Sequence, residues 1–83
     1  MSAPNNQPIS REDKARFEAY RVANPSWGHL ALVLKSGSNV KDGHVLHCQK
    51  EAARHGDQEA YELADILLSL SKSQRIKLGQ QLG

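Results

Sequence analysis

The sequence predicts an all-α fold, a compact bundle of four to five short helices with a central helical hairpin at about 41–55 and 58–70. The main observation is the run 57–72, in which polar side chains recur at steps of three and four and most positions between them are apolar. A helix whose apolar face is this wide needs neighbours on two or three sides. The polar stripe consists of Gln58, Glu62, Asp65, Ser69 and Lys72.

Two further observations support the helical class. Gly56 ends the helix before this run and Asp57 can cap the next one at once, which forces the two helices into a hairpin. The apolar run 30–34 is the best candidate for a strand, but the chain has no second convincing strand to pair with it.

Length and composition bound the kind of protein. The 83 residues make one small domain, expected at 10–83 after a disordered tail at 1–9 that is rich in proline and asparagine. Eleven Lys and Arg against nine Asp and Glu leave a formal charge of +2, too small to indicate a nucleic-acid partner by itself. One cysteine, no secretory signal pattern and no membrane-length apolar run favour a cytoplasmic protein without a membrane partner.

The first helix is expected at about 11–23 and should begin after Ser10. The Ser10 hydroxyl can accept a hydrogen bond from the amide of Asp13, and the acidic first turn suits the helix dipole. Phe17 and Tyr20 are expected to face inward.

A second helix is expected at about 25–35, because proline is favoured in a first helical turn. Its inner face would consist of Trp27, Leu30, Ala31 and Leu34. A strand at 30–34 is the alternative, since a short apolar run cannot be assigned by its period alone. Helix is preferred because a lone strand would lack a partner.

The stop after this segment is assigned to Gly37, which suits the left-handed position following a helix. The third helix would place Val45, Cys48 and Ala52 inward. Ser71–Gln74 forms a capping-box pattern that opens a last helix at about 72–80. Gly79 and the chain end make this last helix marginal.

His44, His47 and Cys48 are the candidate metal ligands. A tetrahedral zinc site needs three or four convergent ligands, and the chain has no second pair of Cys or His residues to complete one. The two histidines follow the solvent stripe of the third helix and Cys48 falls on its apolar side. We therefore expect solvated histidines and a buried thiol, and no metal.

Catalytic residues are not assigned. Cys48, His29 and Asp57 could be drawn as a catalytic arrangement, but nothing in their spacing selects it. The sequence thus predicts a protein that is not an enzyme and needs no cofactor.

The candidate partner-binding residues are two aromatic side chains and the basic C-terminal segment. Lys72, Arg75 and Lys77 follow the last acidic residue, Asp65, and could contact phosphates. Basic residues near a helix end also simply complement the dipole. A lone tryptophan is usually a core anchor, and if exposed Trp27 would be the leading contact residue, with Tyr20 beside it.

Two sequence patterns resemble those of known families. Ala53-x-x-Gly56-Asp57-x-x-Ala60 is similar to the hairpin junction of tetratricopeptide and Sel1-type repeats, although no second copy follows. The pattern at 24–30, 56–60 and 71–79 resembles small accessory proteins of tailed phages and prophages of proteobacteria. That resemblance implies a small protein that binds and modulates a host protein, and it carries no functional residue over.

The leading hypothesis is therefore a non-enzymatic protein-binding module, with a phage-encoded modulator or inhibitor of a host protein as its specific form. A small DNA- or RNA-binding regulator that uses the basic C-terminal segment is the first alternative. A helical metal-binding protein is the second. A homodimer is a further form the protein can take, because a second copy would cover apolar surface that one copy leaves bare.

Overall fold

The computed structural model describes residues 9–35 and 39–82, and every regular element within those ranges is helical. Helix α1 spans Arg11–Ala23, and the 3₁₀ turn η2 at Gly28–Leu30 leads into the short helix α2 at Ala31–Leu34. Helices α3, α4 and α5 span Asp42–Arg54, Gln58–Leu68 and Lys72–Leu82. The all-α class is confirmed. The expected tail, except for residue 9, and the assignment of Gly37 lie outside the described residues.

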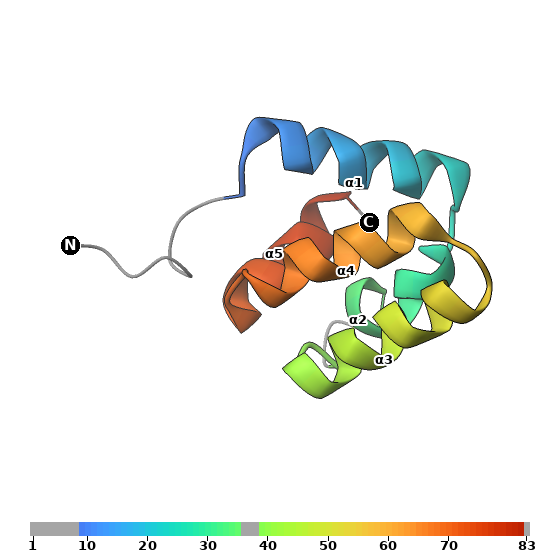
Figure 1. The fold of residues 1–83 in the computed structure, drawn as a ribbon. Coiled ribbons are helices and arrows are strands. Elements are labelled where there is room, and N and C mark those ends of the chain that lie inside the picture. The colour runs from blue at the N-terminus through green and yellow to red at the C-terminus, as the bar shows by residue number, and fades with distance from the viewer. Residues whose placement is uncertain (1–8, 36–38, 83) are drawn as a thin grey trace.

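The central hairpin forms as predicted, with α3 and α4 side by side and antiparallel (Figure 1). Gly56 takes the left-handed conformation, with φ of 72°, and the amide of Asp57 donates to the carbonyl of Ala52 over 2.8 Å. The Asp57 carboxylate then accepts from the amide of Ala60 at 3.2 Å and caps α4. The tight turn is therefore built from one glycine and one capping side chain.

Helix α1 lies across the hairpin and packs against α4 and α5 (Figure 1). Its predicted cap is present, since the amide of Asp13 donates to the Ser10 hydroxyl at 3.1 Å. Phe17 and Tyr20 face inward as expected. On the outer side, the Arg16 guanidinium contacts Glu59 at 3.0 Å and Glu62 at 2.6 Å and links α1 to α4.

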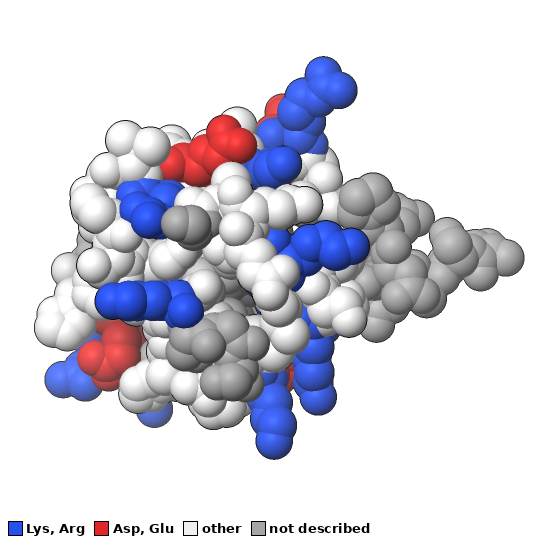
Figure 2. Space-filling model, turned by 180° about the vertical axis from the view of Figure 1, so that it is seen from behind, with Lys and Arg blue, Asp and Glu red and all other residues white. Residues whose placement is uncertain are grey.

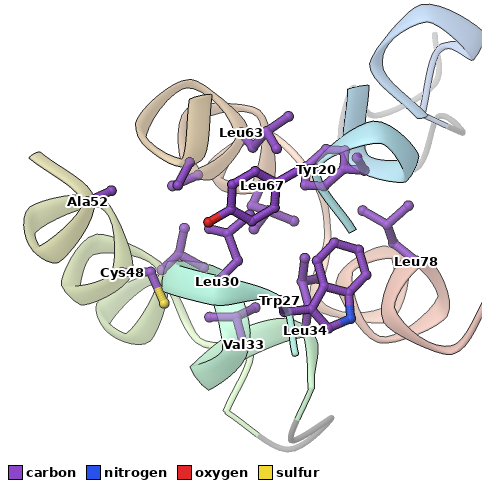
Figure 3. Packing of buried hydrophobic residues seen from close by; sticks show 14 of the residues in the cluster. Tyr20, Trp27, Leu30, Val33, Leu34, Cys48, Ala52, Leu63, Leu67 and Leu78 are labelled. Atoms are coloured by element: carbon purple, nitrogen blue, oxygen red, sulfur yellow. The ribbon is translucent and has the colours of Figure 1, made fainter. Parts of the chain in front are cut away.

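One continuous core joins all the helices, and Figure 3 shows its side chains converging from each of them. Most of the apolar face of α4 is covered as predicted, but Tyr61 on that helix is 41% exposed. Cys48 and Ala52 of α3 point into the same core. The buried residues of α4 are Ala60, Leu63, Ala64 and Leu67.

The segment after α1 differs from the expected helix at 25–35. Residues up to Trp27 form a turn, in which the Trp27 amide donates to the Asn24 carbonyl at 2.7 Å, and helix begins only at Gly28. Trp27 and Gly28 both have positive φ, of 67° and 50°, which a continuous helix cannot contain. The strand alternative for 30–34 is also wrong, because these residues are helical.

Helix α5 runs two residues beyond its predicted end, and Gly79 is the reason it can pack where it does. A Cβ atom at Gly79 would lie 2.5 Å from the carbonyl oxygen of Leu34 at the end of α2. The glycine that suggested a weak helix instead permits a close helix-to-helix approach. None of the described helices is long and apolar enough to cross a lipid bilayer.

We predict opposite effects for alanine at two helical glycines. Gly79→Ala is expected to destabilise the fold by about 1 to 3 kcal/mol, because the new methyl group overlaps the backbone of α2. Gly43→Ala in α3 is the matched control. Nothing lies within 4 Å of a Cβ atom there, so the better helix propensity of alanine should stabilise the fold by up to about 1 kcal/mol. Urea unfolding followed by circular dichroism measures both, and equal effects would contradict the proposed close approach.

Candidate functional site

The structure separates the predicted partner-binding residues into two groups. Lys72 and Lys77 are exposed on α5. Tyr20, Trp27 and Arg75 are buried, with Trp27 and Arg75 each only 2% exposed. The expectation that these three side chains are exposed on an outer contact surface is corrected, since nearly all of their surface is buried within the fold.

Trp27 is a core anchor and not an exposed contact residue. Its ring points inward among the labelled core residues in Figure 3. The guanidinium of Arg21 lies over the ring, 5.9 Å from its centroid, and covers it from solvent. Burying the indole offsets the cost of its left-handed backbone, about 1–2 kcal/mol.

Arg75 connects three segments of the chain from inside the fold. Its Nε donates to the carbonyl of Leu67 at 2.7 Å, near the end of α4, and one terminal nitrogen donates to the carbonyl of Val40. The other terminal nitrogen contacts the Asp42 carboxylate at 2.7 Å, at the start of α3. Because all three guanidinium nitrogens donate within the fold, this side chain is unavailable to a phosphate.

A second polar cluster joins α1, η2 and the hairpin turn. Both the Tyr20 hydroxyl and Nδ1 of His29 lie 2.8 Å from the same oxygen of Asp57, and the His29 amide donates to the Tyr20 hydroxyl at 3.1 Å. The ring of His55 stacks on that of His29, with 5.2 Å between centroids. One carboxylate thus caps α4 and anchors α1 and η2.

The cluster changes the acidity of two of its members. Partial burial favours the neutral form of Asp57, but hydrogen bonds from His29, Tyr20 and the Ala60 amide outweigh it and lower the pKa of the carboxyl group. Burial and the hydrogen bond to Asp57 raise the pKa of Tyr20 to about 12. The carboxylate is therefore held ionised and the phenol neutral.

The catalytic arrangement considered from the sequence is only half assembled. His29 and Asp57 are in contact, whereas Cys48 is 1% exposed and faces the core. Burial raises the pKa of the Cys48 thiol, against weaker opposing hydrogen bonds from the backbone of Val33 and Leu32. A buried thiol with a raised pKa is a poor nucleophile.

The candidate metal ligands do not converge either. His47 is exposed to solvent, His44 is half-buried, and Cys48 is buried in the core. Across the part of the chain that the structure describes, no three His, Cys, Asp or Glu side chains are arranged to hold a metal ion.

Two hollows on opposite sides of α5 form the candidate site, because each combines cations with apolar groups. The first, about 480 Å³, lies between α5 and the start of α1, where it contains Lys14 and Lys77. The second, about 370 Å³, lies between α5 and the segment 21–35, and contains Arg21 and Lys35. The apolar residues that line one hollow or the other are Ile9, Pro25, Trp27, Leu34, Ile76 and Leu78.

Neither lining contains a carboxylate side chain. The other polar side chains are serines and glutamines in the first hollow and one glutamine in the second. Figure 2 shows basic side chains spread over the face of the molecule seen from behind, with acidic atoms only towards its margins. Of the predicted residues, Lys77 lines the first hollow, and the exposed Lys72 lies on the same helix.

Sequence reasoning missed Lys14, Arg21 and Lys35, because they come from segments far from α5 in the chain. No local pattern marks them. The burial of Arg75 did have a signal, since Leu78 and Leu82 follow it at helical spacings of three and seven and place it on the apolar face of α5.

We predict that loss of the Arg75 side chain destabilises the fold. Arg75→Met keeps the length but removes the donor of the Val40 carbonyl and of the Asp42 carboxylate, at a cost of about 2 to 5 kcal/mol. The Leu67 carbonyl loses the guanidinium too but keeps the amide of Leu70. Arg75→Lys should also lose at least about 2 kcal/mol, since one ammonium group cannot reproduce the fork. The control Asp42→Asn should cost about 1 kcal/mol or less, because the Asp42 side chain is 72% exposed. Urea unfolding tests all three, and a stable Arg75→Met variant would contradict this role.

We also predict an acid-dependent contribution from Asp57. Its folded-state pKa lies below the ordinary value of 3.8, so the stabilisation is present above that value and is lost as the pH falls through the folded pKa. The thermal midpoint of the parent should therefore fall more between about pH 6 and pH 2.5 than that of Asp57→Asn, which can still cap α4. Parallel curves for the two proteins would contradict the shifted pKa.

Comparison with known proteins returned no matching family model, no matching curated protein and no matching solved structure.

Proposed function

We propose that this protein is a non-enzymatic protein-binding module, and that the α5 face contacts an acidic and apolar surface of another protein. The observation that carries the proposal is the pair of hollows beside α5, which hold four cationic side chains and no carboxylate in their linings. Lys72 supplies further exposed positive charge along the same helix. A partner with carboxylates beside aliphatic or aromatic side chains would match both kinds of lining.

The apolar groups of the hollows favour a protein partner over a nucleic acid. Protein interfaces combine an apolar centre with arginine and a polar rim, whereas nucleic-acid interfaces are far more strongly basic. The net charge of +2 is modest, and Arg75 is withdrawn into the core. The α5 face would offer a phosphate backbone few cationic side chains besides Arg21 and the lysines.

The biological form of the proposal is a phage-encoded modulator or inhibitor of a host protein, which rests on the resemblance of segments 24–30, 56–60 and 71–79 described above. The proposal includes a cytoplasmic location, which suits a chain whose single thiol is buried and free. It also includes self-association, since a second copy is itself a protein partner.

Nucleic-acid binding is the second candidate, favoured by the exposed lysines of α5 and by the lack of acidic residues in that helix. The two candidates differ in their response to salt. Contacts to phosphates release counterions, so binding to DNA or RNA would weaken steeply between about 50 and 200 mM salt.

We predict that reversing two charges in the first hollow weakens partner binding. The protein is immobilised, its partner is captured from a proteobacterial lysate and purified, and the affinity is measured by calorimetry. Lys14→Glu/Lys77→Glu should lower that affinity at least about tenfold, because both ammonium groups face the partner's carboxylates. Lys41→Glu/Arg54→Glu makes the same change in net charge at exposed positions of α3 and its cap, and it should have an effect of less than about threefold.

Equal losses in the two double variants would point to a general charge effect and contradict the α5 face as the site. A gel shift at low salt with the steep salt dependence of phosphate contacts would replace the protein partner with a nucleic acid.

A further inference from the structure

The outer side of the hairpin carries the clearest apolar surface away from α5. Three large hydrophobic side chains are exposed in the described residues, Val22 at 82%, Leu46 at 51% and Tyr61 at 41%. Val22 is on α1, whereas Leu46 and Tyr61 line one shallow hollow of about 460 Å³ between α3 and α4. Two of the three therefore form a shared patch.

Two stripes of side chains run along the outer side of the hairpin. Leu46, Lys50 and Tyr61 line the hollow itself, and Asp65 lies one helical turn beyond Tyr61. Leu46 and Lys50 lie one helical turn apart on α3, and Tyr61 and Asp65 lie one turn apart on α4. All four are exposed. Each stripe thus pairs a hydrophobic group with a charge, and the two charges are opposite in sign.

We propose that this face binds a second copy of the same chain, which makes the protein a weak homodimer through the α3–α4 hairpin. This inference rests on the self-association included in the proposed function and adds the surface that performs it. In a twofold dimer each copy contributes the same patch, so the patch must complement itself. A face with a cationic stripe on one helix and an acidic stripe on the other does so.

The charges also select the direction of the twofold axis. An axis along the hairpin places α3 of one copy against α4 of the other, and so brings Lys50 of each copy towards Asp65 and the Tyr61 ring of the partner. An axis across the hairpin would place α3 against α3 and bring the two Lys50 ammonium groups together. The first arrangement pairs opposite charges, and the second opposes like ones.

The size of the face sets the expected strength. Helices of 13 and 11 residues are about 20 and 16 Å long, and a hairpin of two is about 20 Å wide, so each copy contributes roughly 350–450 Å². Twice that area lies below the range of stable interfaces, where weak and transient contacts are found. The dimer should therefore dissociate in the micromolar range and be populated only at high concentration.

Sedimentation velocity of the full chain, with NMR dilution from about 1 mM to 10 µM, tests the proposal within this range. Dimerisation should increase with concentration, and the shifts that change on dilution should map to the outer side of α3 and α4. Tyr61→Ser should weaken the dimer about tenfold or more. Val22→Ser removes an exposed hydrophobic group outside the patch and should leave the dimer unchanged.

Charge reversal provides the decisive comparison. Lys50→Glu alone and Asp65→Lys alone should each be monomeric, because each homodimer contains two like-charge contacts. An equimolar mixture of the two variants should recover dimers, since the mixed pair restores an opposite-charge contact on both sides of the axis. Circular dichroism confirms that each variant is folded.

A chain that stays monomeric at about 1 mM, or a mixture that fails to recover, would overturn the dimer. Either result would leave the partner affinity of the Lys14→Glu/Lys77→Glu variant unaffected, because those residues lie on α1 and α5. The two proposals can therefore fail separately.

Discussion

A single buried guanidinium holds the helices of this protein in register. Arg75 donates to the carbonyl of Leu67, to the carbonyl of Val40 and to Asp42, and so ties α5 to the end of α4 and to the start of α3. Taking a cation out of water is costly, and the cost is offset only when its donors are satisfied. Here one acceptor is a carboxylate and two are carbonyls. The position of α5 therefore depends on three acceptors from other parts of the chain.

Placing α5 in this way has consequences around it. The helix approaches the carbonyl of Leu34 so closely that only glycine fits at position 79. The approach also leaves α5 exposed along the outer side of the molecule, with one hollow towards α1 and another towards the segment 21–35. The surface proposed to bind a partner is thus a product of how the core is assembled.

A second fixed point lies at the opposite end of the hairpin. Asp57 accepts hydrogen bonds from Tyr20, from His29 and from the first turn of α4, so α1 and η2 are held against the turn that joins α3 and α4. With both ends of the hairpin anchored, its outer face needs no contact from the rest of the chain. That face presents Leu46 and Tyr61 to solvent, separate from the α5 hollows. It is the second of the two surfaces proposed for association.

The sequence alone determined the features that depend on neighbours in the chain. Helical periodicity and caps placed α1, α3 and α4 within a few residues, and the capping box at Ser71 and Gln74 formed with both its hydrogen bonds. Most of the apolar face of α4 was covered by other helices, with Tyr61 left exposed. Contacts between distant segments decided the rest. Tyr20 and His29 meet at the Asp57 carboxylate although they precede it by 37 and 28 positions in the chain. Arg75 was mistaken for a surface cation because its acceptors lie outside its own helix. Helix formation is governed by interactions within a few residues, whereas a buried charge, a left-handed tryptophan and a close approach at glycine become favourable only once tertiary packing supplies their partners.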